Sequence, residues 1–394
     1  MRLRGSWFDG SDGQAFVRLL TERGFEAYFV GGCVRDDLLG LEIGDIDVAT
    51  SADPRNVLEL AAENGFGTVG KGKGVEFGTV VVIAKKTPFE VTSFRRDVST
   101  DGRRAKVAYH DDLVMDARRR DFTMNALYAN QFGKVLDPLG GLRDLEARRV
   151  RFIGDPRERI AEDYLRILRF FRMGAFFGDP RDGLDRDGLE AIKEMAASVV
   201  SLSRERITHE ILGLMAAPDP SPCVLKMVET GIWDLVLPGA ESKFLRRLVK
   251  IERKYGVVPR RGCNNAAIRR LATTGSAAIA EKLRISRKLE TRWQTLMKAV
   301  HSHLSAAAMA HEFGPVEARD AILVRAAVSG VDANANLESE IARGSREKFP
   351  VHARDLMTEF HGEELGRALR KMKKAWLASG LELNRAELLK MKGG

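Results

Sequence analysis

Two aspartates one residue apart, Asp45 and Asp47, lie near the end of the segment YFVGGCVRDDLLGLEIGDIDVAT, which spans 28–50. Side chains on a β-strand alternate between its faces, so both carboxylates are expected on one face, with Ile46 directed into the core. Carboxylate oxygens are ligands that suit Mg²⁺. Two such ions, about 3.5–4 Å apart, can stabilise the attacking and leaving oxygens of a phosphoryl displacement. A lone D-x-D is more often a solvated turn or a helix cap, so the neighbouring residues must decide between these structures and a metal site.

A pair of glycines, Gly31 and Gly32, precedes the aspartates and follows a short apolar strand. Without a Cβ, the backbone there can turn and approach a ligand closely. The next residues, VRDDLLG, are typical of a short helix whose N-terminus would face an anion. Arg35 in this helix offers its guanidinium to phosphate, or alternatively forms a salt bridge to Asp36 or Asp47. The segment therefore predicts a triphosphate site beside the carboxylates.

Two other phosphate-binding patterns are excluded. No G-x-G-x-x-G follows the first strand, so the dinucleotide-binding fingerprint is missing. GKGKG at 70–74 lacks a GK[ST] at the spacing of a Walker A loop, and we expect a hairpin turn there.

Length and composition predict a globular protein with several domains. The chain has 394 residues, of which 44% are apolar, enough to form more than one core. The sequence has no apolar stretch of about 18 residues, and its polar start is unlike a signal peptide. We therefore expect no membrane association. The three cysteines are far apart in the sequence, which fits a reducing, cytoplasmic environment.

Positive charge is concentrated in one part of the chain. Residues 241–300 contain 16 lysines and arginines against 4 acidic residues, a local charge of +12 in a chain whose net charge is +9. A basic module on a near-neutral remainder is typical of proteins that bind a polyanion. The alternative is a solvated helix surface. Because a phosphate-handling site is predicted elsewhere in the chain, RNA binding is favoured.

The predicted elements change in kind along the sequence. Between residues 25 and 136, short runs rich in Val, Ile, Phe and Thr alternate with helical segments, which predicts a mixed sheet with helices on one side. The charged segment 92–112 contains glycine and is expected to be a long mobile loop. Beyond about residue 151, the sequence predicts helices that Pro and Gly separate. The fold class is therefore α+β, with an N-terminal mixed-sheet head and an all-α remainder.

The GGxVRD and GDIDVAT motifs resemble the signature of the class II tRNA nucleotidyltransferases and bacterial poly(A) polymerases, within the DNA polymerase β superfamily. Further motifs continue the resemblance in order: FEVTSFRRDV (89–98), ARRRDFTMNALY (117–128), DPLGGLRDL (137–145), FIGDPRERIAEDYLRILRFFRM (152–173) and LSRERITHEILGLM (202–215). The resemblance covers roughly residues 25 to 240, and ordered motifs are more specific than any one of them. It implies a polymerase β-like nucleotidyltransferase head followed by a helical neck, body and tail.

The resemblance also implies roles for side chains outside the first segment. Nucleotidyl transfer in this superfamily uses a third carboxylate on a neighbouring strand, for which Glu90 is the candidate; pairing with a nearby arginine is the alternative. Arg119 and Arg120 are implied to border the nucleotide, with Arg120 the stronger candidate. Asp121 is expected to be structural, either orienting these arginines or capping the helix that starts at Phe122.

A second constellation is EDYLRILRFFR at 162–172. Asp163, Arg166, Arg169 and Arg172 are spaced by three, so on a single helix they would form one stripe. Such a stripe is commonly a solvated ion-pair ladder. The resemblance instead implies that Asp163 and Arg166 read the Watson–Crick edge of the incoming base, while Arg169 and Arg172 hold phosphate or the readers' geometry. A carboxylate can accept from the amino group that cytosine and adenine share, and a guanidinium can donate to ring nitrogen or carbonyl oxygen.

These features predict a template-independent tRNA nucleotidyltransferase, similar to the CCA-adding enzymes, that uses Mg²⁺, CTP, ATP and tRNA. Three domains are expected: a catalytic head (1–150), a base-recognising neck (151–216) and a tRNA-binding body and tail (217–394). The alternatives are a bacterial poly(A) polymerase, an enzyme that adds only CC or only A, and a non-catalytic RNA-binding protein. The intact D-x-D, GG and RRD motifs argue against the last of these. The sequence also lacks the arginine-rich segment typical of poly(A) polymerases.

Overall fold

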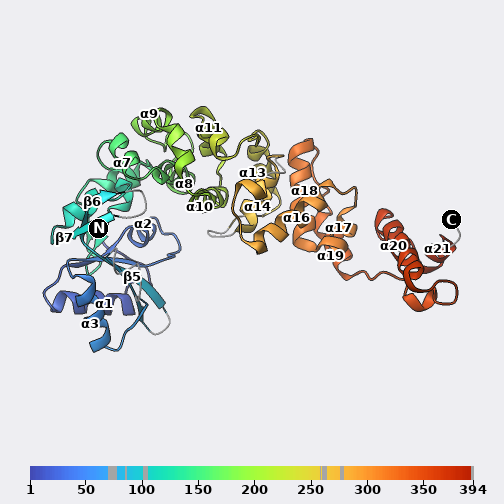
Figure 1. The fold of residues 1–394 in the computed structure, drawn as a ribbon, viewed down its shortest axis with the longest axis horizontal. Coiled ribbons are helices and arrows are strands. Elements are labelled where there is room, and N and C mark those ends of the chain that lie inside the picture. Colours follow the sequence, from blue (N-terminus) through green and yellow to red (C-terminus); the bar gives the residue numbers. More distant parts are fainter. Residues whose placement is uncertain are drawn as a thin grey trace. The chain divides into compact units, whose positions relative to one another are not determined.

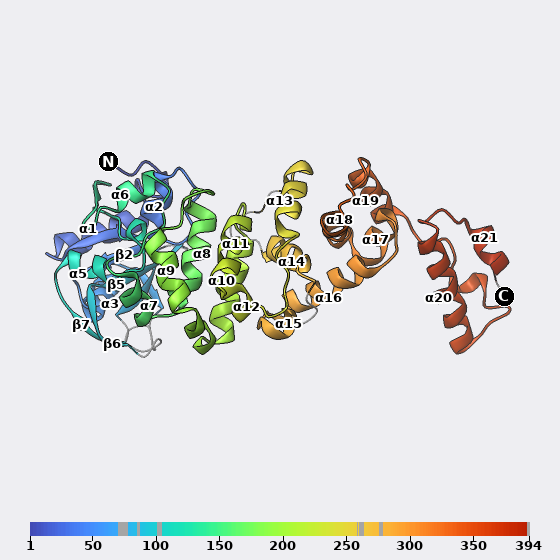
Figure 2. The ribbon, with the colours of Figure 1, turned by 90° about the horizontal axis from the view of Figure 1, so that it is seen from above.

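The computed structural model describes residues 1–69, 78–84, 87–100, 105–257, 259, 264–275 and 279–391 (Figures 1 and 2). The chain divides into two compact units. The N-terminal unit contains Met1–Leu202 with Glu229–Ile232, and the C-terminal unit contains Ser203–Val228 with Trp233–Gly394. The domain boundaries expected at 150 and 216 stay predictions. No helix among the described residues is both long and apolar enough to cross a membrane.

A seven-stranded mixed sheet forms the centre of the N-terminal unit, in the order β3-β4-β5-β2-β1-β8-β9. Strands β2 and β5 run parallel, while the other neighbours in this sheet are antiparallel. This arrangement confirms the predicted mixed sheet. The strands are β1 (Ala27–Val30), β2 (Asp47–Thr50), β3 (Gly67–Val69), β4 (Thr79–Ala84), β5 (Thr87–Ser93), β8 (Tyr128–Ala129) and β9 (Val135–Leu136).

Helices α1 (Asp12–Glu22) and α3 (Pro54–Glu63) pack against this sheet. The ring of Phe16 from α1 meets the ring of Phe89 from β5, with centroids 5.6 Å apart, so Phe89 faces the helices. The Asp53 side chain caps α3 and Pro54 occupies its first turn, as the sequence predicts. Because side chains alternate along β5, Glu90 lies on the opposite face from Phe89.

Segment 92–112 is not the long loop that the sequence predicts. Strands β6 (Arg95–Thr100) and β7 (Ala105–Tyr109) pair antiparallel and form a separate two-stranded sheet. Three consecutive charged residues at the start of β6, Arg95, Arg96 and Asp97, concealed the strand pattern, although Ala105, Val107 and Tyr109 alternate along β7. The predicted hairpin turn at 70–74 lies outside the described residues.

The rest of the N-terminal unit is mainly helical. One prediction here was wrong: the helix expected across 162–172 is interrupted at Asp163, whose backbone is extended. The remaining elements are α2 (Gly32–Leu38), α5 (Leu113–Arg118), η1 (Thr123–Asn125), α6 (Gly141–Glu146), α7 (Pro156–Glu162), α8 (Leu165–Phe177), α9 (Arg186–Glu194) and η2 (Ala196–Ser201).

From α10 onward the elements are helices, which confirms the predicted change in architecture. They are α10 (Arg204–Met215), α11 (Ser221–Glu229), α12 (Ile232–Val236), α13 (Leu245–Lys254), α14 (Asn264–Ala272), α15 (Ile279–Lys282), α16 (Arg287–His301), α17 (Ala306–Phe313), α18 (Pro315–Ser329), α19 (Leu337–Arg346), η3 (Ala353–Asp355), α20 (Gly362–Ala378) and α21 (Arg385–Lys390).

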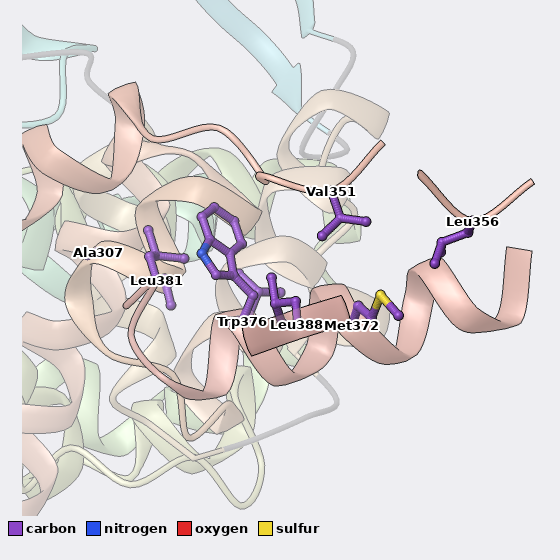
Figure 3. Close-up of a cluster of buried hydrophobic side chains, with 9 residues drawn as sticks. Ala307, Val351, Leu356, Met372, Trp376, Leu381 and Leu388 are labelled. Carbon is purple, nitrogen blue, oxygen red and sulfur yellow. The ribbon is translucent and has the colours of Figure 1, made fainter. Parts of the chain in front are cut away.

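A hydrophobic cluster stabilises the end of the C-terminal unit (Figure 3). Met372 and Trp376 are spaced by four on α20, so they project from one face of that helix. They meet Ala307 from α17 and Leu388 from α21, and all four side chains are buried. This packing explains how a short final helix is held, since isolated helices of this length are marginal in water.

Candidate active site

Two carboxylates lie side by side at the centre of the sheet. The parallel register of β2 and β5 aligns Asp47 with Glu90, and the next pair, Val48 with Val91, is buried on the opposite face. Glu90 therefore occupies the position that the sequence predicted for a third carboxylate. Its carboxylate forms no ion pair with an arginine of the described residues, so the alternative of a cross-strand salt bridge is not observed.

Asp45 lies just before the strand, which differs from the sequence expectation. Strand β2 begins at Asp47, although the carbonyl of Ile46 still accepts a hydrogen bond from the Glu90 amide at 3.0 Å. Ile46 is half-buried and so is not a core residue. Asp45 is exposed, but it raises the pKa of Asp47, which places the two carboxylates near one another.

The carboxylate of Asp47 is partly buried beside other acidic groups. Burial, followed by repulsion from Glu90 and Asp45, raises the pKa of Asp47 to about 6, while Arg120 opposes the rise. Within the described part of the chain, no group of three His, Cys, Asp or Glu side chains is arranged to hold a metal alone. Mg²⁺ commonly takes one or two carboxylates and completes its shell with water and substrate phosphate. One or two carboxylates from Asp45, Asp47 and Glu90, with water and substrate phosphate, would therefore suit such an ion.

The glycine pair forms the turn between β1 and α2. Gly31 has φ +74°, a backbone conformation that residues other than glycine rarely adopt, and Gly32 starts α2. This confirms the predicted turn. Arg35 is buried, its Nη2 lies 2.7 Å from Asp36 and its guanidinium lies 3.8 Å from the centre of the Phe177 ring. The sequence predicted that Arg35 either binds phosphate or forms a salt bridge, and the structure shows the salt bridge to Asp36. Contact of Arg35 with phosphate stays a prediction.

Arg119 and Arg120 are held by one residue that the sequence analysis missed. Asp116, fully buried on α5, accepts from Nε of Arg119 at 2.7 Å and from Nη2 of Arg120 at 3.0 Å. Burial by itself would raise the pKa of Asp116, but Arg120 and Arg119 hold it below its usual value. The Tyr128 hydroxyl also donates to Asp116, at 2.8 Å. The spacing of Asp116 from the two arginines, three and four residues, was a usable signal.

Asp121 has the structural role that was predicted, but with a different arginine. It pairs with Arg169 of α8, whose Nη2 lies 2.6 Å away, and not with Arg119 or Arg120. Burial alone would raise the pKa of Asp121, but Arg169 and the Asn125 amide hold it at about 2. Asn125 also accepts from Arg35, so α2, η1 and α8 are joined by one chain of polar contacts.

The predicted base readers do not share a helical stripe. Asp163 lies between α7 and α8, where its carboxylate accepts from the Leu165 amide at 3.1 Å. Arg166 is on α8 and pairs with Glu162 at 2.5 Å, while its other Nη donates to the Arg119 carbonyl at 3.0 Å. Helical periodicity alone could not show the break, because the polar spacing continues through it. Arg172, also on α8, is half-buried.

Comparisons with known proteins agree with this architecture. Residues 27–151 match the Poly A polymerase head domain, and residues 184–244 match the probable RNA and SrmB-binding site of polymerase A. The chain is 41% identical over 229 residues to the CCA-adding enzyme of Geobacillus sp. (strain WCH70), a match covering 58% of this chain and 54% of that protein. The chain belongs to the class II tRNA nucleotidyltransferase and bacterial poly(A) polymerase family.

More distant relatives of this family extend the similarity over the whole chain. Mitochondrial CCA tRNA nucleotidyltransferase 1 of Mus musculus is 28% identical over 386 residues, covering 95% of this chain and 88% of that protein. The crystal structure of the Bacillus stearothermophilus CCA-adding enzyme in complex with CTP has a TM-score of 0.71 and 26% identity, with 98% of both chains covered. The bacterial sequence matches span only about half the length of the curated relatives. A requirement for a divalent metal ion follows from the family.

The basic segment 241–300 is less available to a polyanion than its composition suggests. Arg269 and Arg270 are buried and share the carboxylate of Glu252, with N–O distances of 2.7 and 2.8 Å. Arg269 also pairs with the buried Asp320 at 2.7 Å. Asp320 belongs to α18, outside this segment, so a local count of charge could not reveal it. The basic side chains of this segment that are exposed, with no ion pair among the described residues, are Arg246, Arg247, Lys250, Arg287, Lys288 and Lys298; Arg247 donates to the Ala327 carbonyl.

Proposed function

We propose that this protein adds CMP and AMP to the 3′ end of tRNA without a nucleic-acid template, building or repairing the CCA terminus. The observation that carries the proposal is the alignment of Asp47 with Glu90 across two parallel strands, beside Asp45 and Arg120. Similarity to CCA-adding enzymes over nearly the whole chain supports the choice of substrates.

The reaction requires a nucleotide α-phosphate, an attacking hydroxyl, and groups that stabilise the negative charge on the phosphate and on the attacking and leaving oxygens. Asp45 and Asp47 would hold Mg²⁺, with Glu90 as the third carboxylate of the site; the bound ions would stabilise the attacking and leaving oxygens. The Gly31–Gly32 turn and Arg35 would face the triphosphate, and Arg120 would donate to it. The tRNA 3′-hydroxyl would attack the α-phosphate of CTP or ATP, and pyrophosphate would leave.

Base selection would depend on the neck. Asp163 would accept the amino proton that cytosine and adenine have in common, and Arg166 would donate to the base edge. Arg166 is already held by Glu162 and a backbone carbonyl, which supports a fixed reader. A site built from such groups rejects a base that leaves them unpaired by a factor of about 10⁴. Arg169 and Arg172 would hold phosphate or the position of these readers.

The tRNA backbone would bind to exposed basic side chains of the C-terminal unit. Arg246 and Lys250 are spaced by four on α13, so they extend from one face of this helix. Contacts of this kind position a nucleic acid without reading its sequence. The buried Arg269 and Arg270 would instead stabilise the fold.

The decisive experiment supplies tRNAs that end before, within and after the CC sequence, with labelled CTP or ATP added separately. The expected products are two C residues on the shortest tRNA, one on the next, and a single A on the tRNA that ends in CC. Asp45→Ala and Asp47→Ala should abolish incorporation while tRNA binding, measured by filter retention, is retained.

Each alternative has its own product. Long A-tails would indicate a poly(A) polymerase, and incorporation of only C or only A would indicate a partial enzyme. Substantial activity in either aspartate variant would refute the metal assignment, and no incorporation by the wild type would refute the proposal. The cytoplasmic location stays a prediction.

A further inference from the structure

The carboxylate of Asp116 binds two guanidinium groups at the end of α5. This helix ends at Arg118, and the two arginines that follow are three and four residues from Asp116. Both spacings bring side chains together on one helix face. Oδ1 of Asp116 accepts from Arg119 and Oδ2 accepts from Arg120, so each oxygen holds a different arginine.

Tyr128 completes this arrangement from the sheet. Its hydroxyl donates to Oδ2 of Asp116 at 2.8 Å and accepts from Nε of Arg120 at 3.0 Å. Strand β8 carries Tyr128 beside Val30 of β1, immediately before the Gly31 turn. Burial raises the pKa of Tyr128, so its hydroxyl keeps the proton that it donates.

One nitrogen of Arg120 is left available by these contacts. Nε and Nη2 are engaged by Asp116 and Tyr128, whereas Nη1 has no hydrogen-bond partner within the described residues. A Cβ at position 31 would lie 3.6 Å from this Nη1, so the nitrogen faces the glycine turn. The same guanidinium acts electrostatically on Asp47, so it lies near the carboxylates as well.

We propose that Asp116 and Tyr128 are positioning residues that fix Arg120 so that Nη1 meets the phosphates of the incoming nucleotide. The identity of this ligand rests on the proposed function. A free arginine side chain loses rotamer entropy when it becomes ordered. Holding it before the nucleotide arrives lowers the cost of ordering it on binding. The arrangement therefore strengthens binding of CTP and ATP equally, because it acts on the triphosphate and not on the base.

The test uses the full-length protein with Tyr128→Phe, which removes the hydroxyl and keeps the ring under Arg120. Tyr28→Phe is the matched control, because it makes the same chemical change in the same unit. For Tyr128→Phe, KM for CTP and ATP and the Kd of magnesium-CTP, measured by calorimetry, should rise about five- to tenfold, which is the size of effect of one ordinary hydrogen bond. KM for tRNA should not change, and kcat should stay within about threefold.

A double-mutant cycle with Arg120→Ala separates positioning from a general structural effect. If Tyr128 acts through Arg120, adding Tyr128→Phe to Arg120→Ala should weaken nucleotide binding no further. Asp116→Asn is the second variant. It should also weaken nucleotide binding, and it should have no further effect in the Arg120→Ala background. Circular dichroism confirms that each variant is folded.

The outcomes distinguish this inference from the proposed function. Unchanged nucleotide binding in Tyr128→Phe, an equal loss in Tyr28→Phe, or additive effects in the cycle would overturn the positioning roles. A wild-type protein that binds magnesium-CTP but transfers no nucleotide would overturn the proposed function alone. A wild type that binds no nucleotide would overturn both.

Discussion

Replacing Asp47 by asparagine should stabilise the metal-free protein while it abolishes nucleotide transfer. Burial and repulsion from Glu90 raise the pKa of Asp47 from 3.8 to about 6, so the folded state holds this proton more tightly than the unfolded state. The free energy of unfolding therefore falls as the pH rises from about 4 to about 6. Above this pH range Asp47 is ionised in both states, and the full free-energy cost of burying its charge lowers the stability of the fold.

The magnitude follows from the same pKa. A rise from 3.8 to about 6 corresponds to about 3 kcal/mol. Because Glu90 is exposed and water screens its charge, we expect a gain of about 2 kcal/mol for Asp47→Asn at pH 8. Asparagine has the same shape without the charge, so packing should be unchanged. The melting temperature should then rise by about 4–8 °C for a unit of this size.

Calorimetric melting of wild type and Asp47→Asn in EDTA, at pH 8 and pH 4.5, measures this effect. The gain should be full at pH 8 and should fall to about a third of that value at pH 4.5, where the folded carboxyl is protonated but most of the unfolded chain is still ionised. Asp111→Asn, which changes an exposed carboxylate of the same unit, serves as the control and should show no gain. A less stable Asp47→Asn protein at pH 8, or a gain independent of pH, would refute the reasoning.

Two further predictions concern the C-terminal unit. Glu252→Gln should lower the free energy of unfolding by about 3 kcal/mol, because Arg269 and Arg270 would lose a buried charged partner. Urea denaturation measures this change, and the Kd for magnesium-CTP should stay unchanged. A neutral effect on stability would contradict this account. Replacing Arg246 and Lys250 together by alanine should weaken tRNA binding and reduce the slope of log affinity against log salt by about 1.8. An unchanged slope would show that α13 makes no phosphate contacts.

Local sequence patterns predicted much of the fold. Asp53 and Pro54 marked the start of α3, and β-branched runs marked the main strands of the sheet. The hairpin of β6 and β7 was missed because β6 begins with three charged residues, and the break at Asp163 was missed because the spacing of polar residues does not change there. Both errors occur where tertiary contacts outweigh local propensity.

The amino-acid sequence determined which chemical groups are present and their order. Carboxylates at positions 45 and 47, a glycine pair before them and arginines at 119 and 120 point to phosphate chemistry, because spacing along a strand or helix is a local property. Only the tertiary structure decided how these groups are paired. It aligned Asp47 with Glu90 through strand register, and it placed Asp121 against Arg169, 48 residues away. Partners this distant are selected by burial, since a charge removed from water must find an opposite charge wherever the chain brings one.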